Sequence, residues 1–292
     1  MEKITRAKRM ENIHSDIRGT LFMEAMEMQA QGSEILKLNT GNPAAFGFGL
    51  PESIEHALEH HIREGVGYCD FKGMPKARIA ICEYERSKGI RGITPEDVFV
   101  GNGVSEVISF ALLPLLDKGD EVLVPSPSYS LWGNSVYMAD GKPVYYICDE
   151  KADWYPDIAD IRSKITKRTK AIVIINPNNP TGMLYPREIL LELIGIAVIT
   201  FGSVKAFYHY SKAFLTKKRY PIRIELANAL ALGLEFKMGA EILKTVLVRS
   251  LNEILILGAI ILLRALLSLM IHFEIKAEQQ HGSPEEASPN NY

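Results

Sequence analysis

The stretch VFVGNGVSE, residues 98–106, decides the predicted fold of this chain. Its first three residues form a β-branched and aromatic run, which is typical of the end of a buried strand. The GNG that follows permits a tight turn, and from Val104 onward apolar residues recur at the spacing of a helix face. Such a turn leaves backbone N–H groups unpaired at the positive end of a helix, which favours a bound anion, most often phosphate. A plain strand-to-helix turn would give the same local pattern, so this alternative stays open.

Composition narrows the class of protein. The chain has 292 residues, enough for one large or two ordinary domains, and its net charge of −2 gives no reason to expect a nucleic-acid partner. The three cysteines, Cys69, Cys82 and Cys148, show no CxxC spacing and cannot all pair. They predict a reduced, cytosolic setting. The N-terminus has no apolar core and is not a signal peptide.

The composition changes near Leu190. Before it, the chain reads as a soluble α/β protein, whereas from there to Phe273 it is rich in Leu, Ile and Ala. The polar stretch from Glu274 to Tyr292 predicts a disordered tail. We therefore expect three parts, at residues 1–192, 193–274 and 275–292.

Strand and helix patterns alternate through the first part. The expected strands are residues 36–39, 98–100, 121–124, 143–148 and 170–175, and helices are expected at 5–31, 51–62, 75–88, 104–116, 157–164 and from Pro186 onward. This alternation predicts a mostly parallel sheet with helices on both faces.

Four motifs carry a family resemblance. GNGVSE (101–106), PSPSYSLW (125–132), DWYPD (153–157) and VIINPNNPTG (173–182) occur in the order and at the spacing of class I/II pyridoxal-phosphate aminotransferases. LNTGNPAAFGF (38–48) and GYCDFKG (67–73) resemble more narrowly the bacterial alanine transaminases. The resemblance covers about residues 1–195. It implies an incomplete large domain of the pyridoxal-phosphate-dependent transferase fold (fold type I), acting on a small amino acid and a 2-oxo acid.

The resemblance implies a role for several residues at the cofactor. Backbone N–H groups of Gly103, Val104 and Ser105 would hold the phosphate of pyridoxal 5′-phosphate. Tyr129 would stack on the pyridine ring, because an aromatic face orients a planar cofactor. Without the resemblance, Tyr129 is equally well explained as an ordinary core aromatic.

Three further residues are implied in binding. Asn179 would donate to the phenolic oxygen of the cofactor and help to hold the substrate carboxylate, and the Gly41 N–H would reach the same carboxylate. Tyr68 would reach the phosphate of the partner subunit, which implies a homodimer. The alternatives are that Asn179 caps a turn and that Gly41 is only a turn residue.

The family's catalytic residues have no counterpart here. Such enzymes need a Schiff-base lysine, an aspartate at the pyridine nitrogen and an arginine for the substrate carboxylate. In this chain the family pattern stops near PREILLELIGIA (186–197), and the later lysines stand in a different context. We therefore assign no catalytic residue and no metal site, expect no covalent attachment of the cofactor, and predict no meaningful transamination by this chain alone.

Three apolar stretches follow, Ile189–Val204, Ile224–Val248 and Ile254–Phe273. A helix of 20 residues spans a bilayer core of about 30 Å. The sequence predicts an all-helical, membrane-embedded region, most strongly for Ile254–Phe273. An interfacial amphipathic helix or a soluble core helix is the alternative for Ile224–Val248.

This part resembles an uncharacterised family of small bacterial integral membrane proteins. The resemblance rests on IELANALALGLEFKMGAEILKTVL (224–247) and on the helix that contains Arg264. It implies a membrane location, and Glu235, Glu241 and Arg264 are the candidates for a polar centre of the helices.

The two parts predict conflicting topologies. Basic residues crowd positions 205–223, and the positive-inside rule places this loop in the cytoplasm. If Ile189–Val204 spans the bilayer, the aminotransferase-like part lies outside, although its cofactor is cytosolic. We therefore expect two unrelated pieces joined near residues 190–197. Either the chain is an aminotransferase relative that keeps half of its cofactor pocket, or its working part is the helical C-terminal region and the first part is an inactive passenger of a membrane protein.

Overall fold

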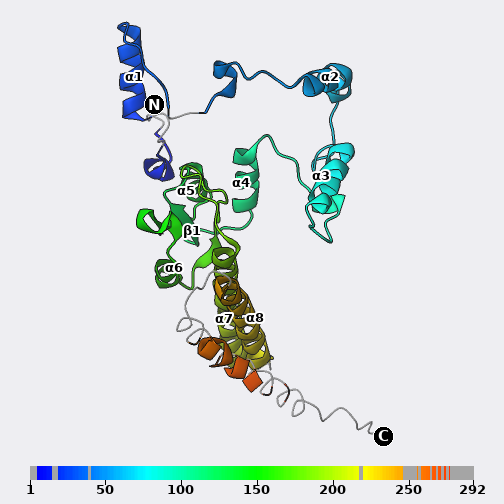
Figure 1. Ribbon diagram of the computed structural model, residues 1–292, viewed down its shortest axis with the longest axis vertical. Coiled ribbons are helices and arrows are strands. Elements are labelled where there is room, and N and C mark those ends of the chain that lie inside the picture. Colours follow the sequence, from blue (N-terminus) through cyan, green and yellow to red (C-terminus); the bar gives the residue numbers. More distant parts are fainter. Residues whose placement is uncertain are drawn as a thin grey trace. The chain divides into compact units, whose positions relative to one another are not determined.

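The computed structural model describes residues 5–14, 19–38, 41–216, 220–245 and separate positions within 255–276. The chain divides into two units, whose helices and strands are labelled in Figure 1. The first comprises Met1–Asp117 and Ser130–Asp140, and the second comprises Lys118–Tyr129 and Gly141–Tyr292. The predicted tail, residues 275–292, lies almost entirely outside the described residues.

The first unit is helical. Its elements are α1 (Thr20–Ala30), α2 (Glu52–His61), α3 (Pro75–Ser87), α4 (Val104–Leu112) and α5 (Leu131–Met138), with short 3-10 turns at Lys8–Asn12, Pro43–Phe46, Ile62–Val66 and Pro95–Asp97. Helix α4 packs against α5, and the N-terminal turn is tied to the end of α5, where Arg9 Nη1 lies 3.1 Å from Asp140 Oδ1. The helices at 51–62, 75–88 and 104–116 are confirmed with small changes at their ends, whereas the expected helix at 5–31 is regular α-helix only over α1.

Two of the expected strands are not formed. Residues 98–100 are extended, but the backbone bond from Val100 N–H to the Lys72 carbonyl (2.9 Å) pairs them with a loop and not with a sheet. Val98 is buried, whereas Phe99 is 60% exposed. Residues 36–38 likewise form no strand. The β-branched run identified an extended segment correctly, but a strand also needs a neighbouring strand to complete its ladder of hydrogen bonds.

The second unit contains the sheet. Its strands are β1 (Glu121–Ser126), β2 (Lys142–Asp149), β3 (Tyr155–Pro156) and β4 (Thr169–Ile172), in the order β3-β2-β1-β4. Strand β1 pairs in parallel with both β2 and β4, and the two-residue β3 pairs antiparallel with β2. The prediction of a mostly parallel sheet is therefore confirmed for the strands near 121, 143 and 170.

The core of this unit joins the sheet to two helices. Leu123, Tyr146 and Cys148 from the strands pack with residues of α6 (Ile158–Lys164) and α7 (Arg187–Thr216). Because β1 lies between two parallel neighbours, it is apolar from Val122 to Pro125 and buried up to Pro125. The side chain of Asp157 caps the start of α6. Its Oδ1 accepts hydrogen bonds from the N–H groups of Ala159 and Asp160, at 2.8 and 3.0 Å.

The buried carboxylate of Glu121 links the start of β1 to residues at or just before the starts of β2 and β4. Glu121, which is 2% exposed, accepts hydrogen bonds from the Thr166 hydroxyl and from Arg168 Nη2 (2.8 Å). Lys142 Nζ lies 3.4 Å from the same carboxylate. The Thr166 hydrogen bond, assisted by those of Arg168 and Lys142, lowers the pKa of Glu121 despite the opposing effect of burial.

This pKa shift predicts a pH dependence of stability. A carboxylate with a lowered folded-state pKa stabilises the fold above its unfolded-state pKa, and this contribution is lost as the pH falls through the folded value. We expect Glu121→Gln to cost about 1.5–3 kcal/mol near neutral pH, the usual worth of a hydrogen bond to a charged group. Urea titrations at descending pH give the free energy of unfolding of the wild type and of the variant. The difference between the two should shrink as the pH falls below the ordinary glutamate pKa. A difference that is constant with pH would contradict the assignment.

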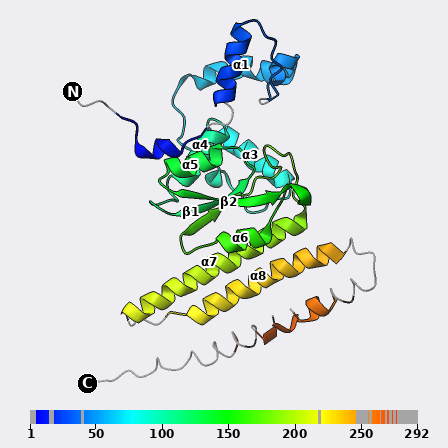
Figure 2. The ribbon, with the colours of Figure 1, turned by 90° about the vertical axis from the view of Figure 1, so that its left-hand side faces the viewer.

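Helices α7 and α8 (Ile222–Thr245) form a hairpin, shown side by side in Figure 2. They touch through small residues: a Cβ on Gly202 would lie 2.0 Å from the Ala229 Cβ, and one on Gly233 would lie 3.1 Å from the Gly195 carbonyl. At the far end of the pair, His209 Nδ1 contacts the Glu225 carboxylate, and Lys205 Nζ lies 3.2 Å from it. The small residues bring the two helix backbones into close approach.

The start of α7 packs against the sheet. Leu193 and Ile196, 1% and 5% exposed, lie in the same core cluster as Leu123 and Tyr146. The first turns of the predicted membrane stretch Ile189–Val204 are therefore covered by protein. Among the described residues, α7 is the helix long and apolar enough to cross a membrane, which is weak support for a span.

The structure describes only part of the other predicted membrane stretches. Much of Ile254–Phe273 lies outside the described residues, and the described part includes exposed leucines. Of the candidate polar centre, Glu235 is exposed on α8, whereas Arg264 and the side chain of Glu241 lie outside what the structure describes.

Candidate functional site

The loop between β4 and α7 is built around Asn178, which is 4% exposed. Its Oδ1 accepts hydrogen bonds from the hydroxyl and N–H of Thr181, at 3.1 and 3.3 Å. Its Nδ2 donates to the Tyr185 hydroxyl at 3.2 Å and to the Pro127 carbonyl at 3.4 Å. The side chain of Asn178 therefore joins this loop to the segment that follows β1.

That junction brings two predicted site residues together. The Tyr129 N–H donates to the Asn179 carbonyl at 2.9 Å, so the segments after β1 and β4 meet. The Asn179 side chain is exposed, and Tyr129 is 37% exposed. Both residues follow the carboxyl ends of adjacent parallel strands, which is where open α/β sheets bind their ligands.

A buried polar layer supports the loop. Tyr185, 2% exposed, has its hydroxyl 3.7 Å from Cys148 Sγ, and the Tyr146 hydroxyl donates to the Val173 carbonyl at 2.8 Å. Burial raises the pKa of both tyrosines and of Cys148, so all three are neutral at physiological pH. They support the loop and are not suited to acid–base chemistry.

The turn before α4 lies in the first unit. Gly103 has a left-handed φ of 80°, which glycine adopts without strain, and its N–H donates to the Gly101 carbonyl at 3.0 Å. Val104 and Ser105 open the helix, so their N–H groups have no intrahelical partner. The carboxylate of Glu106 folds back to accept from the Asn102 N–H. An acidic side chain is therefore placed at the helix start, which suits the positive end of the helix dipole.

The predicted residues divide between the two units. The first unit holds Gly41, Tyr68, Gly103, Val104 and Ser105, and the second holds Tyr129 and Asn179. Gly41 is exposed, with open space around the position of a Cβ, and the side chain of Tyr68 is fully exposed. The sequence reasoning missed Asn178, Tyr185 and Glu106. The first of these had a signal, since an asparagine inside a proline-rich loop is often held by backbone hydrogen bonds.

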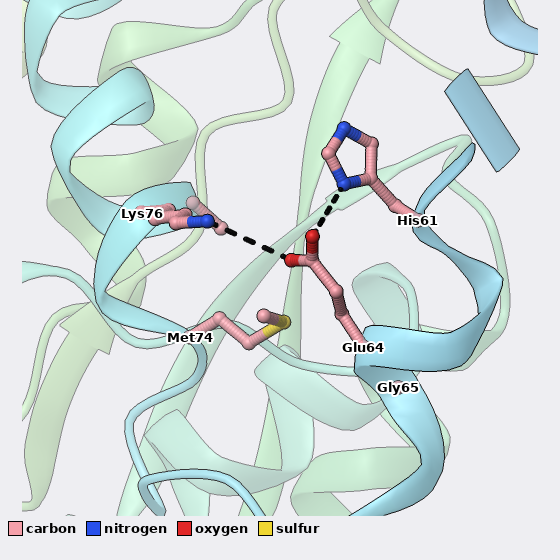
Figure 3. A pocket seen from close by; sticks show the side chains of 6 residues that line it. His61, Glu64, Gly65, Met74 and Lys76 are labelled. Atoms are coloured by element: carbon pink, nitrogen blue, oxygen red, sulfur yellow. Dashed lines mark hydrogen bonds and ion pairs between the residues drawn. The ribbon is translucent and has the colours of Figure 1, made fainter.

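A separate pocket of 400 Å³ lies in the first unit, lined by His61, Glu64, Gly65, Met74, Lys76 and Ala77 (Figure 3). The Glu64 carboxylate lies between His61 Nδ1 (2.9 Å) and Lys76 Nζ (3.6 Å). The hydrogen bond with His61, together with Lys76, lowers the pKa of Glu64. These side chains are well exposed, so their ion pairs contribute little to stability. The pocket contains none of the predicted site residues, and in the described part of the chain no cluster suited to a metal ion occurs.

The mostly parallel sheet with its helices is an α/β architecture. Open sheets of this class bind their ligands beyond the carboxyl ends of the strands. Residues 33–198 match the family described as "Aminotransferase class I and II". The chain belongs to the aminotransferase class I and II family.

Curated relatives agree with this family. Over 197 residues the chain is 49% identical to the glutamate-pyruvate aminotransferase AlaA of Escherichia coli K12, covering 68% of this chain and 49% of that protein. It is 47% identical over 190 residues to an alanine aminotransferase of Mycobacterium tuberculosis, covering 65% of this chain and 44% of the relative. The chain spans about half the length of the curated relatives it matches.

Solved structures show the same relationship. A crystal structure of an aminotransferase from Escherichia coli superposes with a TM-score of 0.65 at 49% identity, covering 67% of this chain and 48% of that one. The alanine aminotransferase of Pyrococcus furiosus gives a TM-score of 0.61 at 44% identity, covering 65% and 49%.

The C-terminal part matches a different family. Residues 202–275 match one described as "Protein of unknown function (DUF1622)". The two matched segments end and begin within α7, at residues 198 and 202, and the helix is continuous across this boundary.

Proposed function

We propose that the aminotransferase part holds pyridoxal 5′-phosphate without a covalent bond, and that this chain alone does not transfer amino groups. The observation that carries the proposal is the hydrogen bond from Tyr129 to Asn179, which presents two exposed side chains of the right chemistry at one sheet edge. When bound, the cofactor supplies an electron sink for chemistry at the carbon that bears the amino group.

The residues of this chain would bind and orient the cofactor. The aromatic face of Tyr129 would fix the plane of the ring, and the Asn179 amide would donate to the phenolic oxygen and to the substrate carboxylate. By the family resemblance, the N–H groups at the start of α4, those of Val104 and Ser105, together with the turn at Gly103, would hold the phosphate.

Two further assignments come from the family resemblance. The Gly41 N–H would meet the carboxylate of a small amino acid or 2-oxo acid, since the space around this glycine is open. Tyr68, with its side chain fully exposed, would reach the phosphate held by the partner subunit of a homodimer.

The contacts of two later lysines, Lys205 and Lys212, support the proposed inactivity. Lys205 stands 18 residues into α7, about 27 Å along the helix axis from Arg187, and its Nζ pairs with Glu225. Lys212 lies over the rings of Tyr208 and Tyr220, at 5.5 and 5.9 Å. These lysines belong to the hairpin, and we propose that none of them acts on the cofactor.

Binding of the cofactor tests the proposal. Titration of the full chain with pyridoxal 5′-phosphate, followed by absorbance and by equilibrium dialysis, should give saturable binding. Asn179→Ala should weaken it about tenfold, because about 1.4 kcal/mol of a charge-assisted hydrogen bond is lost. Asn228→Ala, which changes an exposed asparagine on α8, should leave the affinity unchanged.

Two outcomes would refute the proposed function. The first is the lack of saturable binding by the wild-type chain. The second is turnover of alanine and 2-oxoglutarate by the purified chain at a rate well above that of free cofactor.

A second function is favoured by α7 and by the match of residues 202–275. Of the most apolar stretch of 18 residues in α7, only 22% is buried inside the protein. We propose that the C-terminal helices place the chain at a membrane, with the aminotransferase part in the cytoplasm. Carbonate extraction of membranes that contain the full chain should leave it in the pellet, and release into the supernatant would rule out stable insertion.

A further inference from the structure

Part of the surface of α7 that does not pack on α8 is apolar and exposed. Phe201, Val204, Tyr208 and Leu215 recur at intervals of three, four and seven residues, so they lie along one face of the helix. They are 38%, 37%, 57% and 81% exposed. We call these four residues the outer stripe.

The outer stripe does not face the partner helix. The contacts with α8 come from Gly195, Gly202 and the buried Ala206, which lie on a different side of α7. The outer stripe is therefore left uncovered by the hairpin that the same helix forms.

Basic side chains stand beside the outer stripe. Lys205 and Lys212 follow Val204 and precede Leu215 on α7, and Lys205 is 63% exposed. Lys212 Nζ lies over the ring of Tyr208. From residue 197 to 225, the described residues carry three lysine or arginine side chains and one acidic side chain, Glu225, which pairs with Lys205, so the segment keeps a net positive charge.

We propose that the outer stripe rests on an anionic phospholipid surface, with Lys205 and Lys212 at the level of the headgroups. Exposed aromatic and aliphatic side chains flanked by lysines are the composition of a helix that lies in the plane of a membrane interface. The excess of basic groups complements the negative potential of the cytoplasmic leaflet. This inference rests on the proposed membrane location and adds to it a surface and a class of lipid.

The inference also removes the topological conflict predicted from the sequence. The start of α7 lies in the sheet core, so a helix lying on the membrane keeps the sheet and the basic residues on the same side. No export of the aminotransferase part is then needed to satisfy the positive-inside rule.

A fluorescent probe on the helix tests this surface. In a full chain that carries Cys69→Ser, which removes the exposed native cysteine, Leu215→Cys is labelled with an environment-sensitive dye. Tyr210→Cys, a 60% exposed position on another side of α7, is the matched control. We expect the emission of the dye at 215 to rise with vesicles of phosphatidylcholine and phosphatidylserine, to stay low with phosphatidylcholine alone, and to fall with added salt. The dye at 210 should respond much less.

Charge reversal gives a second readout. Each basic residue near an anionic surface changes the affinity about fivefold, so Lys212→Glu should raise the lipid concentration needed for half of the signal at 215 about twentyfold. Lys212→Gln should have the smaller effect, and Lys151→Glu, at an exposed site outside α7, should have none.

Four results would overturn the inference. They are an equal rise with phosphatidylcholine alone, an equal response at position 210, no response at 215, and a rise that follows protein concentration without lipid, which would indicate a second copy as the partner. A chain that resists carbonate extraction while the dye at 215 stays unresponsive would leave the membrane location standing and remove only this surface.

Discussion

Gly202→Leu is expected to force α7 and α8 apart and to destabilise the hairpin by about 3 kcal/mol or more. The cause is steric. Even a Cβ at this position would lie 2.0 Å from the Cβ of Ala229, and the Ala229 Cα is 3.5 Å away, so relief requires movement of the backbone. A leucine adds three more carbons at the same place.

Hydrogen exchange of the amides in α7 and α8 measures this effect directly, because the hairpin can open without the sheet. The amides of residues 203–216 and 222–240 should exchange much faster in Gly202→Leu than in the wild type. Gly239→Ala is the matched control, since a Cβ there meets only the Leu191 Cδ1 at an ordinary 3.6 Å. That variant should be stabilised by about 0.5–1 kcal/mol through its higher helix propensity. Equal protection in Gly202→Leu and the wild type would contradict the packing described for the pair.

Asn178→Ala is expected to have the second large effect, on both stability and cofactor binding. The side chain is 4% exposed and makes hydrogen bonds to Thr181, Tyr185 and Pro127. Its removal leaves buried polar groups unsatisfied, each of which costs about 1–3 kcal/mol, so we expect a loss of about 3 kcal/mol. Because Asn178 ties the β4–α7 loop to the segment after β1, the spacing of Tyr129 and Asn179 should loosen as well.

Graded variants separate these contributions. Thr181→Val removes one hydroxyl and keeps the shape of the side chain, so it should cost about 1 kcal/mol and leave the Tyr129–Asn179 contact intact. Tyr185→Phe removes the hydroxyl that contacts both Asn178 and Cys148. Its loss of stability should lie between those of Asn178→Ala and Thr181→Val. Urea titration gives the stability of each variant, and dialysis gives its affinity for pyridoxal 5′-phosphate. If Asn178→Ala binds the cofactor as tightly as Thr181→Val does, Asn178 has no positioning role.

The parts of the fold that local pattern determines were predictable. The short run Glu121–Val124, apolar after its first residue, predicted a buried strand, and Pro186 predicted the start of a helix that begins at Arg187. The cap at Asp157 likewise fixed the start of α6. In each case the signal lies within a few residues of the element that it determines.

The failures have a common physical cause, which is dependence on distant residues. Residues 98–100 carry a strand pattern, but the structure gives them Lys72 as a backbone partner and no neighbouring strand. The membrane span expected at residues 189–204 stays a prediction, since α7 is long and apolar enough to cross a membrane while Leu193 and Ile196 at its start pack against the sheet. Composition does not distinguish a helix buried in protein from one buried in lipid.

The binding roles given to Tyr129 and Asn179 stay predictions, and the buried residues that support their loop were not identified from the sequence. The ordered motifs pointed to Tyr129 and Asn179, which the structure places in contact. Asn178 and Tyr185 were not identified, because their importance comes from hydrogen bonds across 7 to 51 residues of sequence. The proline-rich loop gave a local signal for Asn178, but its bonds to Pro127 and Tyr185 depend on the tertiary fold.

The central claim is that the chain binds the cofactor but supplies no lysine to attach it. The most direct measurement is to saturate the wild type and Asn179→Ala with pyridoxal 5′-phosphate, reduce both with borohydride, and map the modified lysines by peptide mass spectrometry. The account predicts only weak, substoichiometric labelling of surface lysines, with the same pattern in the two proteins. One lysine labelled stoichiometrically in the wild type and unlabelled in Asn179→Ala would contradict it.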